Sequence, residues 1–114
     1  MRSMRLVKFD PESGRVVDRY GSNGARYTSV VTLGIEGVVG AMHLGPRGRV
    51  GRHPAPCPQL FLVVSGSGWV SGRGDAQVPI GVGEGVVWEA GEEHESGTVD
   101  GLTAIIIEAT SIVL

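Results

Sequence analysis

The sequence has little of several features that mark particular classes of protein. It contains one cysteine, Cys57, which excludes an internal disulfide and a four-cysteine metal knuckle. Its most apolar stretch, residues 102–114, includes Glu108 and is too short to cross a bilayer as a helix. The first residues carry charges without the apolar run of a signal peptide. We therefore expect a cytoplasmic protein with no membrane partner.

Neither positive nor negative charge predominates in the sequence. Ten basic and twelve acidic residues give a formal net charge of −2, and no run of Lys or Arg forms a basic patch, so no nucleic-acid partner is expected. Hydrophobic residues make up 41% of the chain, which argues against disorder. A length of 114 residues predicts a single domain over residues 1–114, with residues 1–25 as lead-in strands and a loop.

Helical patterning is nearly absent, whereas strand patterning is frequent. Short segments rich in β-branched and aromatic residues alternate with turns rich in glycine, of which the chain has 19. The expected strands are residues 6–9, 16–20, 26–33, 38–44, 59–65, 69–71, 76–80, 85–89, 95–99 and 102–107. This pattern predicts an all-β fold, a sandwich or a barrel, and leaves open an immunoglobulin sandwich, an OB-fold and a jelly roll. The single cysteine disfavours a disulfide-pinned immunoglobulin domain.

The lead-in segments predict association. Strands at residues 6–9 and 16–20 would leave open sheet edges in an isolated chain. We expect these segments to pack on the outside of the main body or against a second copy, and therefore predict a homodimer.

Two glycine-rich segments each place a histidine beside an apolar strand. Residues 48–59 read GRVGRHPAPCPQ and contain His53, and residues 83–94 read GEGVVWEAGEEH and end at His94. In a closed β structure, two such segments can converge although they lie far apart in the sequence.

The order of these segments resembles the cupin superfamily, whose first motif is G-x5-H-x-H-x3,4-E-x6-G. His53 stands at the first histidine, Gln59 at the acidic position and Gly66 at the closing glycine. The leading glycine, Gly48, is displaced by one position, and Ala55 replaces the second histidine.

The second motif of the superfamily, G-x5-P-x-G-x2-H-x3-N, is better preserved. Gly83, Gly91 and His94 match it in spacing. Glu89 replaces the proline and Thr98 replaces the asparagine.

The resemblance covers residues 38–107 and implies a double-stranded β-helix, or jelly-roll, barrel that is usually dimeric. It also implies a divalent metal (iron, manganese, nickel or zinc) held by His53, Gln59 and His94. Because Ala55 supplies no ligand and Gln59 is neutral, we expect any such metal to be held weakly. The alternatives are histidines that hydrogen-bond inside a polar barrel mouth, and a glutamine that binds substrate or packs in the barrel wall.

Two further residues are candidates for acid–base catalysis. Glu89 lies in the acidic turn before His94, where a carboxylate can act as a proton relay; the alternative is a solvated turn. His43 could supply a third imidazole nitrogen to the site from a neighbouring strand. The alternative is that His43 is an exposed residue of its strand.

The sequence is consistent with two functions. The first is a binding module that holds a small polar or sugar-like molecule in the barrel mouth, with or without a weakly held divalent metal. The alternative is a metal-dependent enzyme of the isomerase, epimerase or dioxygenase type, with Glu89 or His43 as acid or base.

Overall fold

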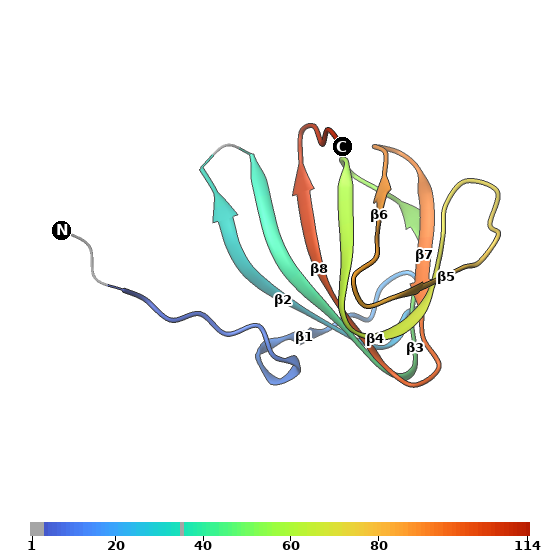
Figure 1. Ribbon diagram of the computed structural model, residues 1–114, viewed down its shortest axis with the longest axis horizontal. Coiled ribbons are helices and arrows are strands. Elements are labelled where there is room, and N and C mark those ends of the chain that lie inside the picture. The colour runs from blue at the N-terminus through green and yellow to red at the C-terminus, as the bar shows by residue number, and fades with distance from the viewer. Residues whose placement is uncertain (1–3, 35) are drawn as a thin grey trace.

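The structure is a computed structural model that describes residues 4–34 and 36–114, and it is all-β (Figure 1). A 3₁₀ turn, Pro11–Ser13, precedes the first strand. The eight strands are β1 (Arg15–Val16), β2 (Asn23–Leu33), β3 (Gly37–Pro54), β4 (Gln59–Ser71), β5 (Val78–Gly81), β6 (Gly85–Trp88), β7 (Glu93–Gly97) and β8 (Leu102–Ala109). No helix in the described part of the chain is long and apolar enough to span a membrane. The predicted all-β class is confirmed.

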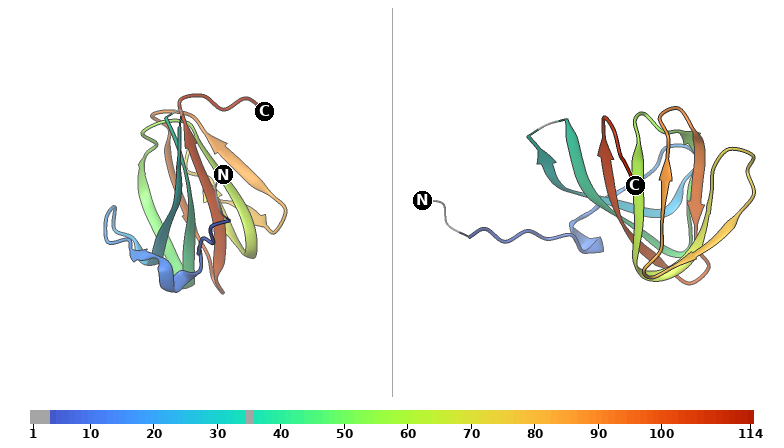
Figure 2. Two further views of the ribbon diagram at one scale, coloured as in Figure 1. Left: turned by 90° about the vertical axis from the view of Figure 1, so that its left-hand side faces the viewer. Right: turned by 45° about the horizontal axis from the view of Figure 1, so that its top comes forward.

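The two longest strands, β3 and β4, close the barrel. The first part of β3 pairs with β2 and β8, and its last part pairs with β7. The first part of β4 pairs with β6 and β8, and its last part pairs with β5 and β7. The strands β3, β8, β4 and β7 therefore form a closed ring, which the views in Figure 2 show from two sides. This is the jelly-roll barrel that the motifs predicted.

On each strand, every second side chain points inward, and these side chains fill the barrel. Leu44, Phe61, Leu102, Ala104 and Ile106 belong to one buried apolar cluster. Because successive side chains of a strand point to opposite faces, their neighbours in sequence point out of the barrel. The alternation fixes which residues of β3, β4 and β8 can reach a site inside the barrel.

The structure corrects several predicted strand boundaries. Residues 6–9 are not a strand, and only Val16 of the predicted strand at residues 16–20 lies in one. Within the described residues no strand lies beside residues 6–9 to complete a ladder, so the strand predicted there is wrong. The predicted strands at residues 59–65 and 69–71 are one strand, because a bulge near Ser65 carries β4 past the intervening glycines.

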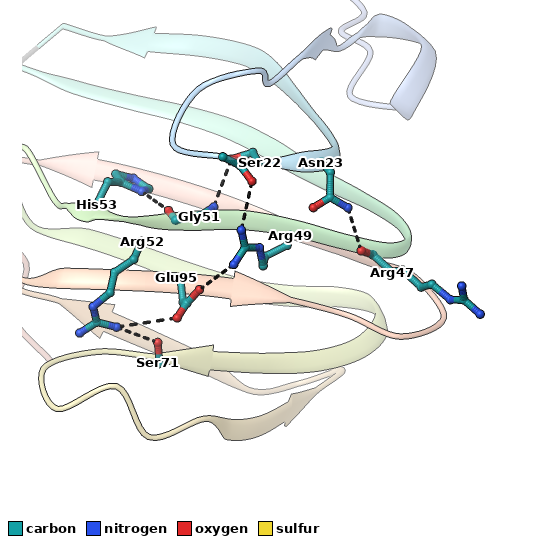
Figure 3. A network of polar contacts seen from close by, with 10 residues as sticks. Ser22, Asn23, Arg47, Arg49, Gly51, Arg52, His53, Ser71 and Glu95 are labelled. Atoms are coloured by element: carbon teal, nitrogen blue, oxygen red, sulfur yellow. Dashed lines mark hydrogen bonds and ion pairs between the residues drawn. The ribbon is translucent and has the colours of Figure 1, made fainter.

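The loop between β1 and β2 is fixed against β3 at Gly51. The backbone N–H of Gly51 donates to Ser22 Oγ at 3.1 Å, and Arg49 Nη2 donates to the carbonyl oxygen of Gly21 at 3.1 Å (Figure 3). A Cβ at position 51 would collide with the carbonyl oxygen of Tyr20. Glycine at position 51 therefore permits the close approach of this loop.

The substitution Gly51→Ala is expected to lower the free energy of unfolding by roughly 1–3 kcal/mol, because the new methyl group must displace backbone. Denaturant unfolding measures the loss. Gly34→Ala is the matched control, since a Cβ at position 34 meets nothing within 4 Å, and it should stay within about 0.5 kcal/mol of the parent. Equal stability of the two variants would contradict the close packing of the loop on β3.

Candidate functional site

A cavity of about 870 Å³ lies inside the barrel, within the usual range for small-molecule sites. Strands β2, β3, β4, β6, β7 and β8 line it, together with the segment from Ser13 to Tyr20. The predicted residues His53, Gln59 and His94 all line this cavity. The structure thus brings His94 together with His53 and Gln59, which lie in a distant segment of the sequence.

His53 and His94 are direct partners across β3 and β7. Their ring centroids are 4.4 Å apart and the rings are inclined by 54°. His94 is 3% exposed, whereas His53 is half-buried. The two imidazoles therefore lie in contact, with His53 on the side nearer to solvent.

The hydrogen bonds of both rings fix their tautomers. Nδ1 of His53 lies 2.7 Å from the carbonyl oxygen of Gly51, and Nδ1 of His94 lies 3.1 Å from that of Glu92. A carbonyl oxygen only accepts, so Nδ1 carries the proton in each ring. In the described residues no hydrogen bond engages Nε2 of either ring, which leaves two lone pairs available to a ligand.

Burial keeps His94 neutral at physiological pH. Removal from water lowers the pKa of His94 below its ordinary value, and the nearby His53 and Arg52 lower it further. The carbonyl oxygen of Glu92 and its carboxylate oppose this shift in part. A neutral His94 can accept a hydrogen bond or a proton at Nε2.

Aromatic rings extend from the two histidines in both directions. Tyr20 stacks on His53 with centroids 4.0 Å apart and an interplanar angle of 7°. On the other side, Trp88 lies 4.2 Å from His94, and Phe61 meets Trp88 edge-on at 5.5 Å. Five rings from five different segments thus form one continuous wall of the cavity.

A second polar group of the cavity surrounds Gln59. In the strand register Gln59 lies between Trp88 and Glu108, and all three line the cavity. Glu108 lies 3.9 Å from the Cys57 thiol, and its charge together with burial raises the pKa values of Cys57 and Tyr27. Sequence analysis missed Glu108 and Tyr27 as cavity residues, because neither lies in the motifs; the inward parity of β8 was the signal for Glu108.

The sequence matches no protein-family model and no curated protein. Solved structures are similar over most of the chain. The polyketide cyclase RemF from Streptomyces resistomycificus has a TM-score of 0.78 at 14% identity, over 96% of this chain and 81% of RemF. A cupin-like protein from Thermotoga maritima has a TM-score of 0.72 at 23% identity, over 78% of this chain and 71% of that one. A cupin-2 domain protein from Rhodospirillum rubrum has a TM-score of 0.75 at 12% identity, over 99% and 77%.

This chain has the cupin fold. The predicted all-β, jelly-roll fold class is confirmed. Identities of 12–23% support the shared architecture and carry no activity or ligand across.

The cupin barrel does not bring His43 or Glu89 to the two histidines. His43 follows the inward-facing Met42 and so points out of the barrel, where its ring nitrogens contact Thr28 Oγ1 at 3.3 Å and Thr103 Oγ1 at 3.2 Å. It lines a different cavity. Glu89 is exposed on the turn before β7 and does not line the cavity of His53 and His94.

The described residues do not form a complete metal centre. No group of three or more His, Cys, Asp or Glu side chains in this part of the chain is placed to hold an ion. Ala55, at the position of the missing histidine in the cupin motif, is 2% exposed and packs in the core. The donors left at the motif positions are the imidazoles of His53 and His94 and the amide of Gln59, and none of these three positions holds an anionic side chain to offset a dication.

The lowered pKa of His94 predicts a pH-dependent stability. The folded-state pKa lies below the ordinary value of 6.5, so the unfolded chain binds more protons as the pH falls through 6.5. The free energy of unfolding should therefore be smaller at about pH 5.5 than at about pH 7.5. The difference should shrink in His94→Gln. Burial also lowers the pKa of His43, and the pH dependence that His43 contributes remains in both proteins.

Denaturant unfolding of the two proteins at both pH values measures this difference. The same pH dependence with and without His94 would show that its burial does not disfavour the charged ring.

Proposed function

We propose that this chain binds a small, flat, hydroxylated organic molecule in the barrel cavity. The observation that carries the proposal is the pair of adjacent Nε2 acceptors, on His53 and His94, within a wall of aromatic rings. A ligand hydroxyl donates to such an acceptor, while a flat ring packs against the aromatic side chains. The wall favours a flat, largely apolar frame over the sugar-like ligand expected from the sequence.

Other cavity residues support this ligand class. Met42, Phe61 and Ile106 provide apolar surface, and the Gln59 amide can both donate and accept. One protein of similar structure is named a polyketide cyclase, and polyketides carry hydroxyl and keto groups on carbon frames. The two proteins are similar in fold. The similarity supports the proposal only because the ligand class in that protein's name agrees with the one proposed here.

Paired probes test the role of the hydroxyl group. We expect 2-naphthol to bind roughly three- to tenfold more tightly than 2-methoxynaphthalene, the usual worth of one neutral hydrogen bond. In His53→Phe and His94→Phe, which keep a ring but lose Nε2, this preference should be lost. Glu89→Gln, outside the cavity, is the matched control and should retain it. Calorimetric titration measures the affinities. Equal binding of both probes to the parent protein would refute the proposal.

An acid–base enzyme is the second candidate, and the neutral His94 beside the ligand space favours it. In this reaction Nε2 of His94 accepts a proton from carbon next to a ligand carbonyl, and the resulting enolate is reprotonated. Deuterium uptake at the α-carbon of 2-tetralone, followed by NMR, detects this transfer. Uptake above the buffer rate that disappears in His94→Gln indicates an enzyme, whereas uptake at the buffer rate indicates binding alone.

The incomplete donor set predicts weak metal binding. We expect purified protein to lose iron, manganese, nickel and zinc on dialysis, because no anionic ligand accompanies the two imidazoles and Gln59. Elemental analysis measures the retained metal, with His53→Ala and His94→Ala as references. One ion retained per chain, and lost in both variants, would contradict this expectation and favour a metal-dependent enzyme.

A further inference from the structure

One carboxylate of the cavity has no cationic partner among the described residues. Glu108 of β8 lines the cavity and is half-buried. No Lys, Arg or His side chain of residues 4–34 and 36–114 forms an ion pair with it, and its hydrogen-bond donor there is the Cys57 thiol, 3.9 Å away. A thiol is a weak donor, so it compensates little for the water that the carboxylate has lost. Glu108 therefore presents unbalanced negative charge to the ligand space.

The other acidic and basic side chains that line the cavity, apart from the two histidines, are open to solvent. Arg15, Asp18 and Arg19 belong to the segment before β2, and all three are exposed. The Arg19 guanidinium lies over the Tyr20 ring, 5.0 Å from its centroid. Water and salt screen exposed charges much more than half-buried ones. We therefore expect Glu108 to influence the charge of the ligand more than these three residues do.

Glu108 belongs to the same wall of the cavity as the two histidines. It is the register partner of Gln59, and Gln59 is the register partner of Trp88. The Trp88 ring in turn lies 4.2 Å from the His94 ring. Neighbouring strands are about 4.8 Å apart, so the backbones at Glu108 and Trp88 are separated by roughly 10 Å across β4. A ligand that reaches from His94 to Glu108 therefore carries its two polar groups at opposite ends of a flat frame.

Tyr27 adds a second acceptor near Glu108. A Cβ at Gly40 would collide with the Tyr27 hydroxyl, so the ring lies over Gly40 of β3. Gly40 pairs with Ile106, which precedes Glu108 by two residues on β8 and faces the same cavity. Burial raises the pKa of Tyr27, and the charge of Glu108 raises it further. An aromatic face and a hydroxyl oxygen both attract an ammonium group, so this part of the cavity favours a cation.

We propose that the ligand carries a positively charged amine at the end that meets Glu108 and a hydroxyl at the end that meets His53 and His94. This inference rests on the proposed function and narrows its ligand class to flat hydroxyaryl amines. An ammonium group donates three hydrogen bonds, and Glu108, the Gln59 amide oxygen and the Tyr27 hydroxyl can accept them. Hydrogen bonds to a carboxylate are roughly twice as strong as neutral ones, so Glu108 selects for charge more strongly than the imidazoles select for a hydroxyl.

Three 2-naphthols that differ at carbon 6 test the charge preference. The 6-aminomethyl compound is a cation, the 6-hydroxymethyl compound is neutral and of nearly the same shape, and 6-hydroxy-2-naphthoic acid is an anion at neutral pH. In calorimetric titrations of the parent protein we expect the cation to bind roughly tenfold or more tightly than the neutral compound, because its hydrogen bond to Glu108 is charged. The anion should bind most weakly.

A pair of variants assigns the preference to Glu108. Glu108→Gln keeps the shape of the side chain and removes its charge, so the cation should bind no more tightly than the neutral compound, whose own affinity should stay nearly unchanged. Asp18→Asn is the matched control, since it removes a carboxylate from the exposed part of the cavity lining, and it should retain the preference. A preference that is lost in Asp18→Asn and kept in Glu108→Gln would overturn the inference.

The parent protein can also refute the inference without any variant. Equal binding of the cation and the neutral compound would show that Glu108 does not select for charge, and tightest binding of the anion would assign the preference to Arg15 and Arg19. In either case the proposed function stands if the neutral compound binds more tightly than its methyl ether at carbon 2. If none of the three compounds binds, the proposed function is refuted, and this inference with it.

Discussion

The pairing of β3 with β7 at His53 and His94 is the constraint on which the site depends. It places two imidazoles from distant parts of the sequence in contact, with their rings inclined by 54°, inside the barrel. The backbone carbonyls of Gly51 and Glu92 then hold both Nδ1 protons. Because these acceptors are backbone carbonyls, at Gly51 of β3 and at Glu92 directly before β7, the tautomers follow from the backbone of the barrel and not from mobile side chains.

The outer side of the same strand pair carries a group of charged side chains. Arg49 and Arg52 flank Glu95 of β7 at 3.7 and 4.0 Å (Figure 3). Arg52 also donates to Ser71 Oγ at 3.2 Å, which links β3 to β4. Exposed ion pairs of this kind contribute little energy, so their main effect is to position the strands. Arg52 additionally helps to keep His94 uncharged.

Much of the fold and part of the site follow from the sequence. Short β-branched segments between glycines were sufficient for the all-β class, and the motif spacing predicted that His53, Gln59 and His94 share a cavity. The positions of His43 and Glu89 could not be predicted, because each depends on a face or a turn that only strand register decides. Tyr20 enters the site through a tertiary contact that no local pattern records, whereas the alternation along β8 was a signal for Glu108.

The central claim is that both rings present an unprotonated Nε2 to the cavity. Long-range ¹H–¹⁵N NMR of the imidazoles at neutral pH tests it most directly, with His53→Phe and His94→Phe for assignment. The structure predicts the Nδ1–H tautomer for both residues. A proton on Nε2 of either ring in the free protein would contradict the account.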